Sequence, residues 1–191
     1  MAGKQAKILS QDNVKDLLVY AECTRHPQRN RRIILLSAKA GWRAAEMANL
    51  TWDMVLDADG AIGRAVELYD QAAKNRGGRR IPLHPELRHA LAASRGVTDN
   101  TGPVVRSERG GPMKPLSIVA WFWTAYRELR LEGCSSHSGR RTFITRAARL
   151  VHKADGSLRD VQLLAGHRSI QTTQRHIDGD SDVQRKLVAM I

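Results

Sequence analysis

Two stretches near the C-terminal end, HSGRRTFITRAARL at residues 137–150 and LLAGHRSIQTTQRHIDG at residues 163–179, decide how the rest of the chain is interpreted. The first places His137 and Arg140 three residues apart, a spacing that puts both side chains on one face of a helix. Guanidinium and imidazole donors match the geometry of phosphate oxygens, so the pair indicates a pocket for an anion. Because exposed basic residues are ordinary on helices, a plain surface pair is the simpler interpretation of this motif alone.

The composition indicates the class of protein and the class of partner. The chain has 191 residues, enough for one domain with a sizeable core. Its 31 lysines and arginines against 19 acidic residues give a formal net charge of +12. This excess predicts a polyanionic partner, nucleic acid before an acidic membrane surface. No apolar run reaches the roughly 20 residues that span a bilayer, and no signal peptide is recognisable, so we expect a cytoplasmic protein without a membrane partner.

The two cysteines, Cys23 and Cys134, have no partner spacing that would suit zinc. We therefore expect reduced thiols and no metal site.

Apolar spacing in the first part of the chain predicts helices. One helix is expected over residues 11–26, and a buried helix is expected after Pro27 that ends at Gly41. Arg43 follows at the start of a short helix, and Glu46 lies three residues further on, within reach of the guanidinium. The pair is open to two interpretations, a structural ion pair and a phosphate ligand with its supporting carboxylate.

The period of the sequence then changes from helical to extended. Turn signals at Asp59-Gly60 and at residues 75–78 separate three short strands, which predicts a small antiparallel meander. Lys74 lies at the rim of the second turn. The plain interpretation is a solvated basic hairpin tip, and the alternative is a finger that reaches DNA with Lys74 at its catalytic end. Further basic residues of this tip are Arg76, Arg79 and Arg80.

The second part of the chain again reads as helical. A helix is expected from Pro85, and a long amphipathic helix from Pro115. The fold class predicted for the whole chain is α+β, mostly α-helical with a small antiparallel three-stranded sheet. A last helix over residues 180–191 needs a surface for its apolar side, either at home or on a neighbouring molecule. The aromatic residues predicted to lie in the core are Trp121, Phe122, Trp123 and Tyr126.

The motifs stand in one order: R-x-x-E after a glycine, a lysine in a β-hairpin, H-x-x-R, then Gly166-His167, and a last residue nine positions later. This order resembles the catalytic domain of the tyrosine recombinases, the phage integrase family, from about residue 11 to the end. The resemblance implies the catalytic-domain fold of that family, with residues 1–191 as a single domain. Family members usually carry an N-terminal DNA-clamp domain as well, and we expect it to be absent because 191 residues leave no room for it.

The resemblance also implies a role for each matched residue. Arg43 and Arg140 would clamp the non-bridging oxygens of the scissile phosphate and stabilise the transition state. Lys74 would protonate the departing 5′ oxygen as general acid. His137 would handle protons near the nucleophile, and His167 would donate a hydrogen bond to the phosphate.

Further implications concern the surroundings of the reaction. Glu46 would hold Arg43 in place, and double-stranded DNA would be the partner. The family forms a 3′-phosphotyrosyl link that another strand then reseals, so neither a metal nor a cofactor is required. A dimer or tetramer would assemble on DNA through the C-terminal tail. The basic residues expected to contact DNA are Arg76, Arg79, Arg80, Arg141 and Arg168.

The chain departs from the family at the nucleophile, because His176 stands nine residues past His167 where a tyrosine is expected. Smaller departures are Ala40, where threonine is common, and Gly139, where an apolar residue is usual. Imidazole can attack phosphorus, but its nitrogen would lie away from the position of a tyrosine oxygen, and attack is sensitive to roughly 1 Å. The three tyrosines, outside the nucleophile motif, are Tyr20, Tyr69 and Tyr126.

Three functions follow from these observations. The first is a site-specific recombinase or integrase catalytic domain whose DNA strand cleavage is impaired or altered by His176, with DNA binding intact. The second is a non-cleaving DNA-binding regulator derived from an integrase. The third is a topoisomerase of the same chemistry, which the exchangeable apolar tail disfavours.

Overall fold

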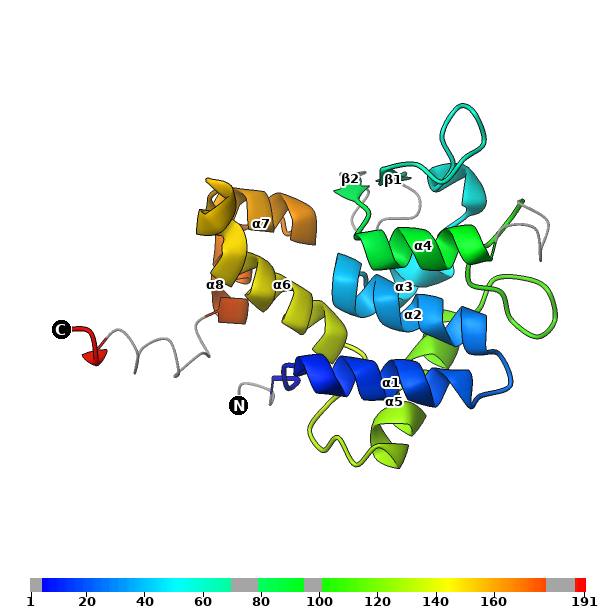
Figure 1. Ribbon diagram of the computed structural model, residues 1–191, viewed down its shortest axis with the longest axis horizontal. Coiled ribbons are helices and arrows are strands. Elements are labelled where there is room, and N and C mark those ends of the chain that lie inside the picture. Colours follow the sequence, from blue (N-terminus) through cyan, green and yellow to red (C-terminus); the bar gives the residue numbers. More distant parts are fainter. Residues whose placement is uncertain (1–4, 70–78, 95–100, 178–187) are drawn as a thin grey trace. The chain divides into compact units, whose positions relative to one another are not determined.

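The computed structural model describes residues 5–69, 79–94, 101–177 and 188–191. The chain forms two compact units, Met1–Phe143 and Ile144–Ile191. The order of elements along the chain can be followed in Figure 1. Whether the two units act as a single catalytic domain stays a prediction.

The first unit begins with a pair of helices that lie side by side, α1 (Gln11–Glu22) and α2 (Pro27–Ala40) (Figure 1). The hydroxyl of Ser10 accepts a hydrogen bond from the backbone amide of Asn13 at 3.0 Å and so caps α1. Proline opens α2, and Gly41 ends it in the left-handed conformation at φ +67°. Both helices and the stop at Gly41 were predicted and are confirmed, although α1 ends four residues earlier than expected.

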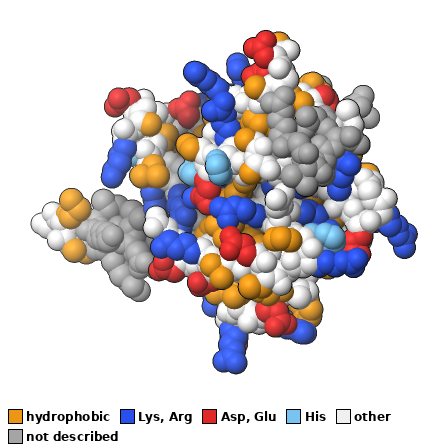
Figure 2. All heavy atoms as spheres, turned by 45° about the vertical axis from the view of Figure 1, so that its right-hand side comes forward, with side chains coloured by type: hydrophobic (Ala, Val, Ile, Leu, Met, Phe, Trp, Pro, Cys, Tyr) orange, Lys and Arg blue, Asp and Glu red, His pale blue; other side chains and the backbone are white. Residues whose placement is uncertain are grey.

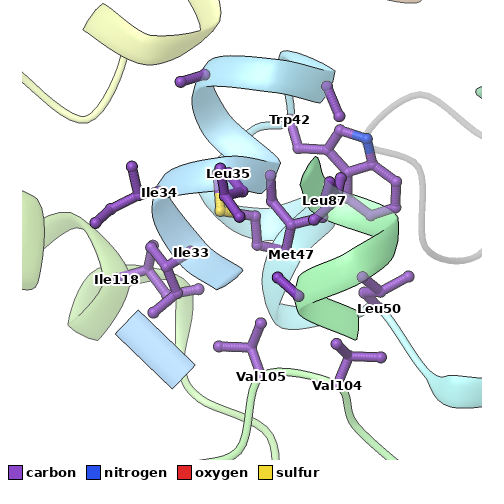
Figure 3. Close-up of a cluster of buried hydrophobic side chains, with 14 of the residues drawn as sticks. Ile33, Ile34, Leu35, Trp42, Met47, Leu50, Leu87, Val104, Val105 and Ile118 are labelled. Atoms are coloured by element: carbon purple, nitrogen blue, oxygen red, sulfur yellow. The ribbon is translucent and has the colours of Figure 1, made fainter. Parts of the chain in front are cut away.

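The core of the first unit lies among α2, α3 (Ala44–Ala48), α4 (Pro85–Ala93) and α5 (Pro115–Glu128). Helix α4 packs against α2, and α3 packs against α5. In Figure 3 the side chains of Leu35, Met47 and Leu87, one from each of three helices, point toward one another. All three are fully buried, so this core fixes the short segment between α2 and α3 that carries the candidate site.

The described part of the sheet has two strands, β1 (Ala65–Leu68) and β2 (Arg79–Pro82). They pair antiparallel, with Val66 opposite Ile81, and both of these side chains face the core. The prediction of a small antiparallel sheet is confirmed, and its three-stranded form is wrong.

The segment expected to form the first strand folds differently. The segment begins with a 3-10 helix, η1 (Trp52–Met54). Within the segment, β-pairing is limited to one isolated bridge, between Leu56 and Ile62. The carboxylate of Asp57 accepts the backbone amide of Ala61 at 2.8 Å, which closes a tight turn immediately after η1. Too few residues therefore remain between η1 and the turn to form a strand.

Helix α5 buries only part of its aromatic series. Phe122 and Tyr126, four residues apart, share the buried face and stack with ring centroids 5.7 Å apart. Trp123 lies on the next face, 60% exposed, beneath the guanidinium of Arg127 at 4.9 Å. The core prediction is thus right for Phe122 and Tyr126 and wrong for Trp123, whereas Trp121 is half-buried.

The second unit contains the end of α6 (Ser138–Leu150), η2 (Val151–Ala154), α7 (Leu158–Ala165) and α8 (Ile170–Ile177). Helix α7 packs on α8. Its start is capped by Ser157 and Asp160, and Gly166 ends it in the left-handed conformation.

The helix predicted over residues 180–191 falls largely outside the described residues. Across the described ranges, no helix combines the length and the apolar character that crossing a membrane requires.

Candidate functional site

Gly41 brings the end of α2 to the start of α6. Its carbonyl oxygen accepts a hydrogen bond from Nη1 of Arg140, which lies 99 residues away in sequence. The left-handed backbone suits glycine, and a Cβ at this position would overlap the ring of Phe143. The glycine therefore fixes both the turn before Arg43 and the position of the Arg140 side chain.

Glu46 is the centre of the charged cluster. Its side chain is fully buried and accepts the backbone amide of Arg43 at 2.9 Å and Nη1 of Arg43 at 2.9 Å. Arg79 donates to the same carboxylate through Nη1 at 3.1 Å and Nη2 at 3.2 Å, a two-pronged arrangement. Burial alone would raise the pKa of Glu46, but the hydrogen bonds and charges of Arg79 and Arg43 outweigh burial and hold the pKa below its ordinary value.

Arg140 adds a third guanidinium to this cluster and is only 4% exposed. Burial first, and then the positive charges of Arg43 and Arg79, lower the pKa of Arg140, while Glu46 acts in the opposite direction. Arg43 and Arg79 contact the carboxylate, and Arg140 interacts with it through charge, so the local positive charge exceeds what Glu46 neutralises. Such a cluster is chemically suited to bind a doubly charged oxyanion.

His137 lies one residue before α6 and is exposed, whereas Arg140 is buried. Its carbonyl oxygen accepts the amide of Arg141 at 2.9 Å, so it begins the helical hydrogen bonding. That His137 and Arg140 serve one phosphate pocket stays a prediction. Arg141, expected to contact DNA, donates through Nη1 to the backbone carbonyl of Ala6 at 2.7 Å.

The basic residues of the hairpin divide into three kinds. Lys74 and Arg76 lie outside the described residues. Arg79 begins β2 and its guanidinium is turned to Glu46, with 11% of the side chain exposed. Arg80 is exposed and lies opposite Glu67 in the sheet. The structure thus places Arg79 in the buried cluster and not at an exposed tip.

In the second unit, His167 is held between α7 and α8. It is 8% exposed, and its Nδ1 lies 2.9 Å from the hydroxyl of Thr173. Gln162 donates from its side chain to the carbonyl oxygen of His167 at 2.9 Å. Both Gln162 and Thr173 are buried, so the imidazole has a fixed orientation within its own unit.

His176 lies in α8, three residues after Thr173. The same short helix therefore orients the His167 ring and carries the backbone of the nucleophile position. The side chain of His176 is outside the described part. Arg168, another expected DNA contact, is exposed at the turn between α7 and α8.

Neither the partner of Glu46 in β2 nor the two residues that support His167 can be recognised from sequence patterns. Arg79 and Glu46 are 33 residues apart, and no spacing rule connects a strand residue with a helix residue at that distance. Thr173 lies six residues after His167 across a turn, which is likewise no recognised motif.

The chain is similar in sequence to known proteins. A sequence model described as the phage integrase family matches residues 7–181. The tyrosine recombinase XerC of Brucella suis biovar 1 (strain 1330) is 28% identical over 158 residues, which cover 80% of this chain and 47% of XerC. The chain thus spans about half the length of this curated relative.

Two solved structures are similar in fold. The XerA recombinase superposes with a TM-score of 0.76 at 22% identity, covering 96% of this chain and 64% of XerA. The Tn1549 transposon integrase, in complex with a circular intermediate DNA, gives a TM-score of 0.71 at 18% identity and covers 92% of this chain and 62% of that integrase. The fold predicted from the motifs is therefore confirmed, and the chain belongs to the phage integrase family, the tyrosine recombinases.

Proposed function

We propose that this chain is the catalytic part of a site-specific DNA recombinase, in which Arg43 and Arg140 bind the phosphate at which strands are exchanged. The observation that carries the proposal is the buried cluster of three guanidinium groups around Glu46. A phosphate oxyanion would relieve the repulsion among the arginines and would gain charge-assisted hydrogen bonds. Arg79 then acts with Glu46 to position Arg43.

Double-stranded DNA is the proposed partner. The formal net charge of +12 favours a polyanion, and basic side chains recur across the face drawn in Figure 2. The Tn1549 transposon integrase, which shares the fold, was solved with DNA. Assembly into a dimer or tetramer through the C-terminal tail is proposed because Val188, Met190 and Ile191 are apolar and strongly exposed.

The proposed chemistry is transfer of a phosphodiester from the 5′ oxygen of one nucleotide to an enzyme side chain. The attacking group passes its proton to His137 as it forms a bond to phosphorus, the bond from phosphorus to the 5′ oxygen breaks, and Lys74 supplies the proton to that oxygen. A hydroxyl from another strand reverses these steps. With His176 at the nucleophile position, we expect strand cleavage to be lost or strongly reduced while the phosphate pocket still binds DNA.

The experiment that tests this proposal compares the natural chain with the His176→Tyr variant. Each is incubated with a pool of nicked duplexes whose arms are randomised, and covalent adducts are separated on denaturing gels under neutral and acidic conditions. We expect an adduct with the tyrosine variant alone, because the site lacks only its nucleophile. An adduct of the natural chain that is lost in acid would instead mean that histidine attacks, since phosphoramidates are acid-labile.

A control isolates the role of the phosphate pocket. In the His176→Tyr background, Arg43→Ala should reduce covalent capture at least about a hundredfold, the effect typical of removing one donor to the developing charge. Arg127→Ala removes the same charge from an exposed position on α5 and should leave capture unchanged. No adduct with either protein at any duplex would overturn the cleavage proposal and favour the non-cleaving regulator, which no separate observation supports.

A further inference from the structure

A second basic cavity lies at the opposite end of α2 from the candidate site. It has a volume of about 130 Å³, and among the residues that line it are His26, Arg29, Arg32, Trp52 and Arg106. Helix α2 has 14 residues, so a rise of about 1.5 Å per residue separates its two ends by roughly 20 Å. The cavity is therefore distinct from the Arg43 cluster, although both belong to the first unit.

Arg32 is the most informative residue of this cavity. Arg32 is only 7% exposed. Among the described residues, its buried Nε has no hydrogen-bond partner. A buried N–H donor that lacks an acceptor is costly, and such groups are normally satisfied by protein, water or ligand. Burial, followed by the charges of Arg29 and Arg106, lowers the pKa of Arg32 to about 10.

The neighbouring arginines are held in place by the protein backbone and by polar side chains. Nε of Arg29 donates to the side-chain oxygen of Asn30 at 3.0 Å, and Asn30 in turn donates to the hydroxyl of Thr24 at 2.8 Å. Nη2 of Arg106 donates to the carbonyl oxygen of Thr101 at 2.6 Å. The cavity is thus a prearranged basic site, and its binding of a small anion would require little reordering of side chains.

The start of α2 adds to the positive potential of the cavity. Its first turn has no acidic residue, and the side chain of His26 makes no capping hydrogen bond. The positive end of the helix dipole therefore lies beside the arginines. Glu108 is the nearby carboxylate, but it is bound at the rim to Arg25 at 3.1 Å and to His26 at 3.2 Å and is half exposed.

From this geometry we infer that the cavity lined by Arg29, Arg32 and Arg106 binds a phosphate group, separately from the site of strand exchange. The phosphate would accept hydrogen bonds from Arg32, whose guanidinium is the buried donor, with Arg29 and Arg106 as flanking charges. Its source would be either a backbone phosphate of DNA at a distance from the scissile one or a free phosphorylated molecule. This inference goes beyond the proposed function and does not depend on strand cleavage.

The test uses tryptophan indole resonances as local reporters in a titration with inorganic phosphate at constant ionic strength. Trp52 lines the cavity, whereas Trp42 lies between Gly41 and Arg43 at the candidate site. We expect a saturable shift of the Trp52 signal that Arg32→Gln abolishes and that Arg25→Gln, a matched loss of charge outside the cavity, retains. The Trp42 signal reports independently on the site of the proposed function.

A second arm distinguishes the two sources. Duplex DNA at saturation should remove the response of Trp52 to added phosphate if a DNA phosphate occupies the cavity, and Arg32→Gln should then reduce the salt slope of DNA binding by about one contact. A response that persists in the DNA complex assigns the cavity to a free phosphorylated molecule. If circular dichroism shows that the Arg32→Gln variant is unfolded, the Arg106→Gln variant is used in its place. An absent or unsaturable shift of Trp52 in the natural chain would overturn the inference.

Discussion

Glu46 is a single buried carboxylate that contacts Arg43 and Arg79 and interacts through charge with Arg140. Replacing it with glutamine keeps the shape of the side chain and removes the counter-charge of Arg43, Arg79 and Arg140. We expect Glu46→Gln to lower the free energy of unfolding by about 3–5 kcal/mol, the cost of leaving one side of a buried ion pair without its partner. Urea denaturation at neutral pH measures this quantity.

A matched variant, Glu67→Gln, removes the same charge from an exposed position in β1. Its effect on the free energy of unfolding should stay within about 0.5 kcal/mol. Equal losses in the two variants would mean that Glu46 does not organise the arginines.

The acid response belongs to the same residue. Hydrogen bonds and the charges of Arg79 and Arg43 outweigh the opposing effect of burial and hold the folded-state pKa of Glu46 below 4.5. The ionised carboxylate therefore stabilises the fold above pH 4.5, and that stability is lost as the pH falls through the folded-state value. We expect the natural chain to lose stability more steeply than Glu46→Gln below pH 4.5. Parallel curves would show that another group governs acid unfolding.

At the scale of elements, the close approach of α2 and the beginning of α6 decides where Arg140 lies. A Cβ at Gly139 would overlap the hydroxyl of Ser37, which is the physical reason for a glycine at this position. We expect Gly139→Ala to lower the free energy of unfolding by about 1–3 kcal/mol through overpacking. In the His176→Tyr background it should also reduce covalent capture, because α6 and Arg140 would move away from Gly41.

A double-mutant cycle tests whether Ser37 is the cause. Ser37→Gly alone should cost about 0.5 kcal/mol in helix propensity. The double variant should lose less unfolding free energy than the sum of the two single losses, because the obstructing hydroxymethyl group is gone. The difference, which is the coupling energy, should be about 0.5–3 kcal/mol. Strictly additive costs would show that the contact between α2 and α6 is not the source of the effect.

At the scale of the whole molecule, charge should govern DNA affinity. With a formal net charge of +12, binding of duplex DNA should weaken steeply with salt, because each phosphate contact releases counterions. The logarithm of the binding constant should fall with the logarithm of salt concentration by about 0.9 per contact. Fluorescence anisotropy over a range of salt concentrations measures this slope, and a flat response would contradict DNA binding through the phosphate backbone.

The sequence determined the first two helices, the stop at Gly41 and the identity of the family. Apolar spacing and glycine stops are local properties, so α1, α2 and the end at Gly41 followed from short stretches of chain. The order of motifs was enough to identify the fold, because five short signals in one order are specific when each alone is not. The ion pair of Arg43 with Glu46 was equally accessible, since the two are one helical turn apart.

Only the tertiary structure decided which distant groups meet. The pairing of Arg79 with Glu46, the hydrogen bond from Arg140 to Gly41 and the basic cavity at Arg32 each join residues of different elements. The exposure of Trp123 and the loss of the third strand likewise depend on neighbours outside the local sequence. The physical reason is that periodicity specifies which side of an element is apolar, whereas the packing of elements specifies which charges share a buried space.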